Sequence, residues 1–136
     1  MKKSSIFILL ILIPVIMAMG SGLDGDSPEK IPVPKEKFNA TYIDQMDIVT
    51  DCTDISINGK TFIEGNMGEG VYTMPFKEIK DVTFLQKDGK LAGVVKLVGN
   101  GQVDLILNTN HKAYGKTKYG TFQIKIAKLK KMTLHH

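Results

Sequence analysis

Few side chains in this sequence have the type and spacing that catalysis or metal binding requires. The histidines are His111, His135 and His136, and no HxxxH or CxxC spacing is present. Cys52 is the only cysteine, so no disulfide can form within the chain. We expect its thiol to be buried and inert, with pairing to another chain as the alternative. A Cys52–His111 nucleophile pair is one catalytic option, but nothing in the sequence activates that thiol.

We therefore predict that the chain is not an enzyme, with a hydrolase as the minor alternative. We also predict no metal and no cofactor. The glycine-rich stretch from Gly65 to Gly70 lies between two expected strands, so it lacks the following helix whose amides would bind phosphate.

Basic side chains are concentrated toward the C-terminal end. All 18 basic residues are lysines, and all 14 acids lie at or before Asp104. Lysine lacks the bidentate fork of arginine, so we predict no nucleic-acid binding. Two interpretations remain for this region: a solvated face that protects a sheet edge, or a site for an anionic ligand or membrane surface. The second would use Lys112, Lys116, Lys118, Lys125, Lys128, Lys130 and Lys131.

A group of acids forms the other candidate site, at Asp44, Asp47, Asp51 and Asp54. Clustered carboxylates suit Ca²⁺, but the glycine and terminal glutamate of an EF-hand loop are missing. We expect solvated acids, with a cation site as the alternative. The same stretch is predicted to hold one strand over 45–50 and a turn over 51–53.

A repeat positions most of these residues. Residues 65–84 match residues 115–134 without a gap, and the weaker similarity extends the units to 54–84 and 104–134. Both copies share two glycines, alternating large apolar residues and then apolar residues three apart. The period of two predicts a strand with one buried face. The paired glycines predict a tight hairpin with positive φ angles, and the change of spacing predicts a helical turn followed by a strand.

The remaining pattern predicts an all-β fold. Asn58-Gly59 is typical of a type I′ hairpin turn. Further strands are expected over 82–86, 90–98 and 102–107, separated by glycine-containing turns. We predict a small sandwich or barrel of about eight to ten short antiparallel strands, built from two similar units. The expected core is Ile55, Ile57, Phe62, Tyr72, Met74, Phe76, Ile79, Val82, Phe84, Leu91, Val95, Val103, Leu105, Leu107, Phe122, Ile124, Ile126, Leu129 and Met132.

The N-terminal residues have the three-part pattern of a secretory signal. A basic start at Lys2 and Lys3 precedes the apolar run 6–18, and small residues precede a cleavage point near Gly20-Ser21. We predict a signal peptide at 1–20, a flexible linker at 21–37 and one domain at 38–136, with an uncleaved membrane anchor as the alternative. The mature protein would be periplasmic or extracellular.

These observations lead to two hypotheses about function. The first is a non-enzymatic exported bacterial module that binds a protein partner, or a second copy, in the envelope. The second is a binding module for an anionic ligand or membrane surface through its lysine-rich C-terminal unit. Over residues 55–134 the repeat pattern resembles small bacterial envelope proteins, a resemblance that assigns no functional residue.

Overall fold

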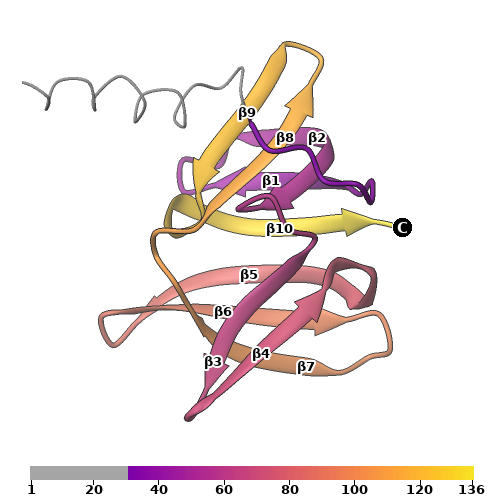
Figure 1. The fold of residues 1–136 in the computed structure, drawn as a ribbon. Coiled ribbons are helices and arrows are strands. Elements are labelled where there is room, and N and C mark those ends of the chain that lie inside the picture. Colours follow the sequence, from indigo (N-terminus) through magenta and orange to yellow (C-terminus); the bar gives the residue numbers. More distant parts are fainter. Residues whose placement is uncertain (1–30) are drawn as a thin grey trace, which may run out of the picture.

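Ten antiparallel strands form one continuous sheet in the computed structural model, which describes residues 31–136 (Figure 1). The predicted signal peptide at 1–20 lies outside the described residues. The elements are β1 (Asn39–Asp44), β2 (Val49–Ile57), β3 (Phe62–Met67), β4 (Gly70–Pro75), the 3₁₀ helix η3 (Phe76–Glu78), β5 (Ile79–Lys87), β6 (Lys90–Leu97), β7 (Gln102–Leu107), β8 (Lys112–Thr117), β9 (Gly120–Lys125), the 3₁₀ helix η4 (Ile126–Lys128) and β10 (Leu129–His135).

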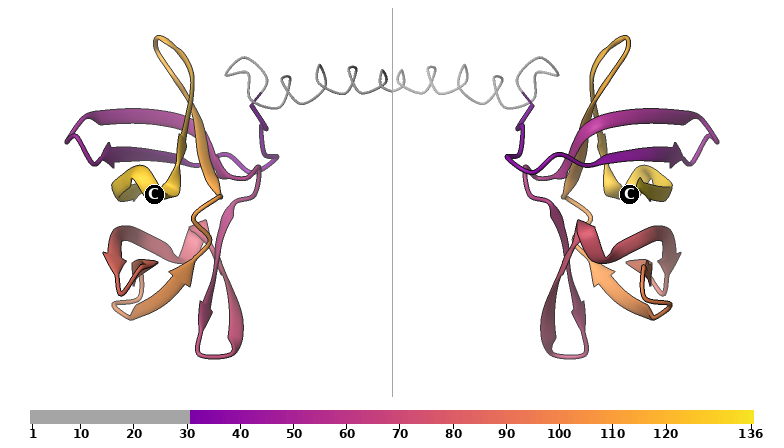
Figure 2. Two further views of the ribbon diagram at one scale, coloured as in Figure 1. Left: turned by 90° about the vertical axis from the view of Figure 1, so that its left-hand side faces the viewer. Right: turned by 90° about the vertical axis from the view of Figure 1, so that its right-hand side faces the viewer.

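The strand order across the sheet is β4-β3-β7-β6-β5-β10-β1-β2-β8-β9. The sheet curls into a half-barrel, with β5 and β10 at its centre and the hairpins β3–β4 and β8–β9 at its two ends (Figures 1 and 2). The all-β prediction is therefore confirmed, and the strand number agrees with it. The predicted sandwich or barrel is met only in part, because the sheet forms a half-barrel in which β4 and β9 remain open edges.

The core fills the inner face of the curled sheet. Thirteen of the predicted core residues are buried, including Phe76, Ile79 and Leu129, each with no exposed surface. Tyr72 was also predicted to be buried, but its side chain is 47% exposed on β4. Phe62, Met74, Val103, Phe122 and Ile124 are only partly buried. Other buried residues outside the predicted core are Ala40, Tyr42, Ile63, Ala92, Ala113, Tyr114 and Leu134, together with Cys52, whose burial was predicted separately.

The stretch 38–54 differs most from its prediction. It contains β1, a turn and the first part of β2, rather than one strand over 45–50. Asp44 forms the turn, since its Oδ1 accepts the backbone N–H groups of Met46 and Ile48 at 2.8 and 3.0 Å. Such a side-chain bond competes with strand pairing, so β1 ends and a turn begins at the point where the apolar pattern predicted the start of a strand.

The repeated glycines bracket two tight hairpins as predicted, but only Gly120 of the four has the predicted positive φ. Gly65 and Gly115 lie inside strands without positive φ, while the loop glycine Gly68 has φ 62° and Gly120 has φ 134°. A Cβ on Gly115 would lie 2.6 Å from the Cys52 Cβ, and one on Gly65 would lie 2.8 Å from the Leu105 Cβ. Both glycines therefore permit close packing of a hairpin strand against its neighbour.

Other local predictions are confirmed. Asn58 and Gly59 have φ angles of 52° and 82° in the turn after β2. The predicted helical turns are the 3₁₀ helices η3 and η4, and the strands that follow them begin at Ile79 and Leu129. The last part of the predicted linker contacts the domain, because the Glu36 carboxylate accepts the Thr61 hydroxyl at 3.1 Å.

Candidate interaction surfaces

The edge strand β4 is the most exposed strand of the described chain. All of its residues except Met74 are exposed, and Val71 and Tyr72 are 64% and 47% exposed. No residue of β4 is charged. Met67, which ends β3, is 44% exposed beside it. Natural sheets usually protect an exposed edge with lysine or another inward-facing charge, so β4 has the properties of a strand that pairs with something.

The backbone of β4 presents hydrogen-bonding groups away from the sheet. Met67 and Gly70 close a two-residue hairpin loop and face each other in the β3–β4 ladder, so Gly70, Tyr72 and Met74 direct their backbone groups toward β3. By alternation, Val71, Thr73 and Pro75 direct theirs outward. Pro75 has no N–H group, and an outward-facing position on an edge strand is where a sheet tolerates proline.

The opposite edge, β9, is basic. The hairpin β8–β9 (112–125) contains four lysines and no acid, whereas the hairpin β3–β4 (62–75) contains Glu64 and Glu69 and no lysine. The two hairpins project at opposite ends of the molecule (Figure 2). The hairpin at one end of the sheet is therefore acidic, and the hairpin at the other end is basic.

The structure separates the seven predicted lysines into different surroundings. Lys112, Lys125 and Lys128 line one shallow hollow together with Gln123 and Ile124. Lys116 lies 3.7 Å from the Asp54 carboxylate. Lys130 forms an ion pair with Asp47, and the Lys118 ammonium lies 5.1 Å from the centre of the Tyr119 ring.

Lys131 is partly buried on β10, opposite Ile43 on one side and Thr83 on the other. Of the seven lysines, the structure thus places three around one hollow rather than all on one patch.

The four aspartates do not share a site. Asp44 forms the β1–β2 turn, Asp47 pairs with Lys130, and the Asp51 carboxylate accepts the Thr41 hydroxyl at 2.6 Å. Asp54 lies 3.8 Å from Lys37, in addition to its contact with Lys116. Within residues 31–136 no group of three or more His, Cys, Asp or Glu side chains is placed to hold a metal ion.

A groove lies between the β1–β2 turn and the tip of the β8–β9 hairpin. Ile48, Val49, Tyr119 and Phe122 supply its apolar lining, and Asp51 and Lys118 are its charged members. Tyr119 is 87% exposed at the tip of the hairpin. Phe122 stacks on Tyr42, with ring centroids 5.8 Å apart, and this contact fixes the floor of the groove. The sequence indicated none of this, because the turn and the hairpin tip are about 70 residues apart and adjoin only in the folded sheet.

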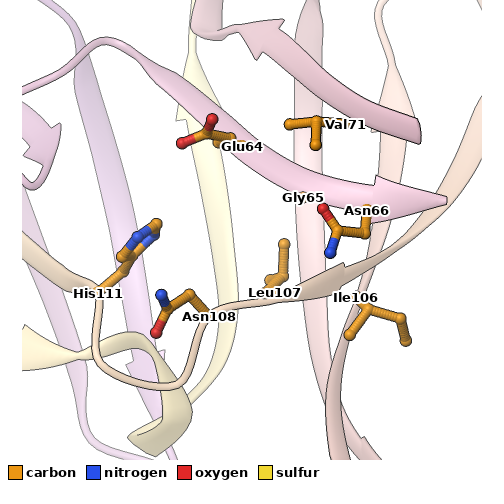
Figure 3. Close-up of a pocket in the computed structure, with 8 residues that line it drawn as sticks. All are labelled: Glu64, Gly65, Asn66, Val71, Ile106, Leu107, Asn108 and His111. Atoms are coloured by element: carbon orange, nitrogen blue, oxygen red, sulfur yellow. The ribbon is translucent and has the colours of Figure 1, made fainter. Parts of the chain in front are cut away.

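A second hollow contains the polar side chains Glu64, Asn66, Asn108 and His111 (Figure 3). It lies where β3 and β7 diverge, since their ladder is limited to the pair Asn66–Ile106. Glu64 and His111 also line the adjoining hollow beside Asn58 and Lys60. The sequence drew attention to His111 alone, and the acidic side chain that lines the same two hollows is Glu64.

Cys52 lies inside the sheet and is 3% exposed. Burial, reinforced by the nearby Asp51 carboxylate, raises the pKa of its thiol to about 12. The prediction of a buried cysteine is thus confirmed, and the thiolate required of a nucleophile is disfavoured at neutral pH.

Burial, with a smaller contribution from Cys52, also raises the pKa of Tyr42 well above its ordinary value. Its hydroxyl donates a hydrogen bond to the Tyr114 carbonyl oxygen at 2.9 Å. Ser56 is likewise a core residue, with no exposed surface, and its hydroxyl oxygen accepts the Gly59 N–H at 3.2 Å. Tyr42, Cys52 and Ser56 are therefore buried side chains that pack in or against β2.

The fold is therefore a small all-β domain, a ten-stranded half-barrel. Among the described residues, its two edge strands are β4 and β9, and each belongs to a hairpin, β3–β4 or β8–β9. Residues 34–136 match a family model whose description reads "Uncharacterised protein", and the chain belongs to that family. No curated protein and no solved structure matches the chain. No helix among the described residues is long and apolar enough to cross a membrane.

Proposed function

We propose that this chain is a non-enzymatic, exported β-rich module that binds a protein partner through an exposed edge of its sheet. The observation that carries the proposal is β4, an uncharged edge strand with exposed Val71 and Tyr72. Extended segments bind such edges by adding a strand, with main-chain hydrogen bonds supplying affinity and side-chain contacts supplying specificity. Export is supported by the N-terminal signal pattern.

Site-specific cross-linking in the cells that produce the protein tests this proposal. A photo-reactive amino acid at Tyr72 in the full chain should yield discrete cross-linked species. The same group at Asp88, in the turn between β5 and β6, is the matched control. Adding Val71→Lys to the Tyr72 probe should remove these species, because lysine on an edge strand opposes pairing. Equal cross-linking from positions 72 and 88 would contradict a specific edge.

A second candidate function is binding to an anionic ligand or membrane surface. It is favoured by the hollow that Lys112, Lys125 and Lys128 line, because clustered lysines attract anionic groups. The full chain should co-sediment with phosphatidylglycerol vesicles at low salt and be released at high salt. Lys125→Glu with Lys128→Glu should abolish binding, whereas Lys87→Glu with Lys90→Glu, at the β5–β6 turn, should not. Equal loss in both double variants would contradict a localised site.

We also propose that the domain arose by internal duplication of one hairpin–turn–strand unit. It is supported by a constant offset of 50 residues between β3, β4, η3 and β5 and the elements β8, β9, η4 and β10. The sheet order also reads β4-β3-β7-β6-β5 from one edge and β9-β8-β2-β1-β10 from the other. In a crystal structure of the domain, residues 62–84 and 112–134 should superpose after a rotation of about 180°. A superposition no better than that of unrelated β hairpins would contradict duplication.

A further inference from the structure

The charges at the two ends of the sheet are complementary. The β3–β4 hairpin carries two acids and no lysine, and the β8–β9 hairpin carries four lysines and no acid. Glu64 and Glu69 are exposed and make no ion pair within the part of the chain that the structure describes. Like-charged hairpins would repel each other, so the charges favour pairing of β4 with β9 of another copy over pairing with a second β4.

The direction of the strands allows the same arrangement. All neighbouring strands in the sheet are antiparallel and the number of strands is ten, so the two edge strands run in opposite directions in the strand order. A second copy whose β4 lies beside β9 therefore continues the antiparallel ladder. In that arrangement the start of β4, next to Glu69, adjoins the end of β9 at Lys125.

Exposed apolar side chains accompany both edges. Val71, Tyr72 and Met67 lie on the acidic hairpin, and Tyr119 lies at the tip of the basic hairpin. Removal of these apolar side chains from water would favour pairing. Main-chain hydrogen bonds alone would add little, because they replace hydrogen bonds to water. The two hairpins project at opposite ends of the molecule, so both edges can be engaged at once (Figures 1 and 2).

We propose that copies of this chain associate head to tail, with β4 of one copy added to β9 of the next. This inference rests on the proposed function and names its partner as a second copy of the chain. The interface is heterologous, so a pair of copies still has one free β4 edge and one free β9 edge. Further copies can add at these edges, and the assembly therefore grows with concentration.

Sedimentation velocity of the purified full chain across a concentration series tests the assembly. The wild type should form species larger than a dimer. Glu69→Lys and Lys125→Glu should each weaken association by about tenfold, since each replaces an attraction at the rim of the interface with a repulsion. The double variant Glu69→Lys/Lys125→Glu should associate within about threefold of the wild type, because the pair is exchanged rather than lost. Leu85→Lys, on β5 away from both edges, is the control for a general effect of added charge.

A mixing experiment separates the head-to-tail arrangement from a symmetric dimer. Val71→Lys blocks β4, and Lys118→Glu/Lys125→Glu reverses the charge of the β9 end. Each variant should be monomeric alone, and an equimolar mixture should form a one-to-one dimer through the two intact edges. Self-association of the β9 variant alone would show β4–β4 pairing and overturn the proposal.

A wild type that remains monomeric up to about millimolar concentration would also overturn self-association. That result would leave the cross-linking at Tyr72 as an independent test of a different protein partner. Circular dichroism of every variant confirms that the sheet is intact, so loss of assembly is separated from loss of fold.

Discussion

Gly115 marks the point where β8 packs most closely against β2. A Cβ at this position would lie 2.6 Å from the Cys52 Cβ and 3.0 Å from its Sγ, and the Cβ cannot rotate away. Gly115→Ala should therefore lower the free energy of unfolding by about 1 to 3 kcal/mol through overpacking. Gly99→Ala is the control, because nothing lies within 4 Å of its Cβ position. Urea denaturation of both variants measures the difference, and equal midpoints would contradict the close approach.

The thiol of Cys52 should be nearly unreactive in the folded protein. Its pKa is raised from 9.0 to about 12, so the thiolate fraction at pH 8 falls by roughly a thousandfold, in addition to the loss of access through burial. Labelling with a thiol reagent should follow the rate of unfolding. Fast labelling in native buffer that matches labelling in urea would contradict the buried site.

The same pKa shift makes stability depend on alkaline pH. The folded pKa is raised, so Cys52 contributes no loss of stability below pH 9.0, where both states are protonated. Above that pH the unfolded state releases its proton first, and the free energy of unfolding falls until the folded pKa of about 12 is reached. Cys52→Ala should reduce this slope, although it also lowers stability at neutral pH by leaving a small cavity. Equal slopes from pH 9 to pH 11 would contradict the shift.

At the scale of elements, the turn after β2 connects two parts of the sheet that are distant in sequence. Asn58 has φ 52°, its N–H donates to the Lys112 carbonyl oxygen, and its Oδ1 accepts the Lys112 N–H, each at 2.8 Å. Asn58→Gly keeps the turn and loses the side-chain bond, so it should cost about 1 kcal/mol. Asn58→Ala also opposes the positive φ and should cost about 1 kcal/mol more. Thermal denaturation compares the two, and an Ala variant as stable as the Gly variant would contradict this account.

Most elements could be predicted from the sequence because their signals are local. Asn58-Gly59 specifies its turn, and the spacing after Phe76 and Ile126 specifies the two 3₁₀ helices. The exposure of Tyr72 could not be predicted, because its alternation with Met74 and Phe76 matches a strand with one buried face. Tyr72 is exposed because β4 lies at the edge of the sheet, and the strand order is not contained in the local pattern. The polar hollow at Glu64 and His111 depends on the pairing of β3 with β7, which a single sequence does not contain.

At the scale of the whole molecule, the position of a strand in the sheet order should set its hydrogen exchange. β5 and β10 have partners on both sides and the most deeply buried side chains, including Val82, Leu129 and Met132. Their amides should exchange only through global unfolding, whereas β4 and β9 open locally at lower free energy. Protection should therefore fall from the centre of the sheet toward both edges.

The edge strand β4 provides the most specific form of this prediction. In the monomer the Tyr72 N–H faces β3 and should be protected, while the Val71 and Thr73 N–H groups face outward and should exchange within seconds to minutes. If a second copy adds its β9 to this edge, the outward amides gain partners at high protein concentration and the Tyr72 amide changes little. Dilute samples should lose this added protection. Amide exchange followed by NMR at two concentrations measures it, and slow exchange at Val71 in dilute protein would show that this edge is already covered within one chain.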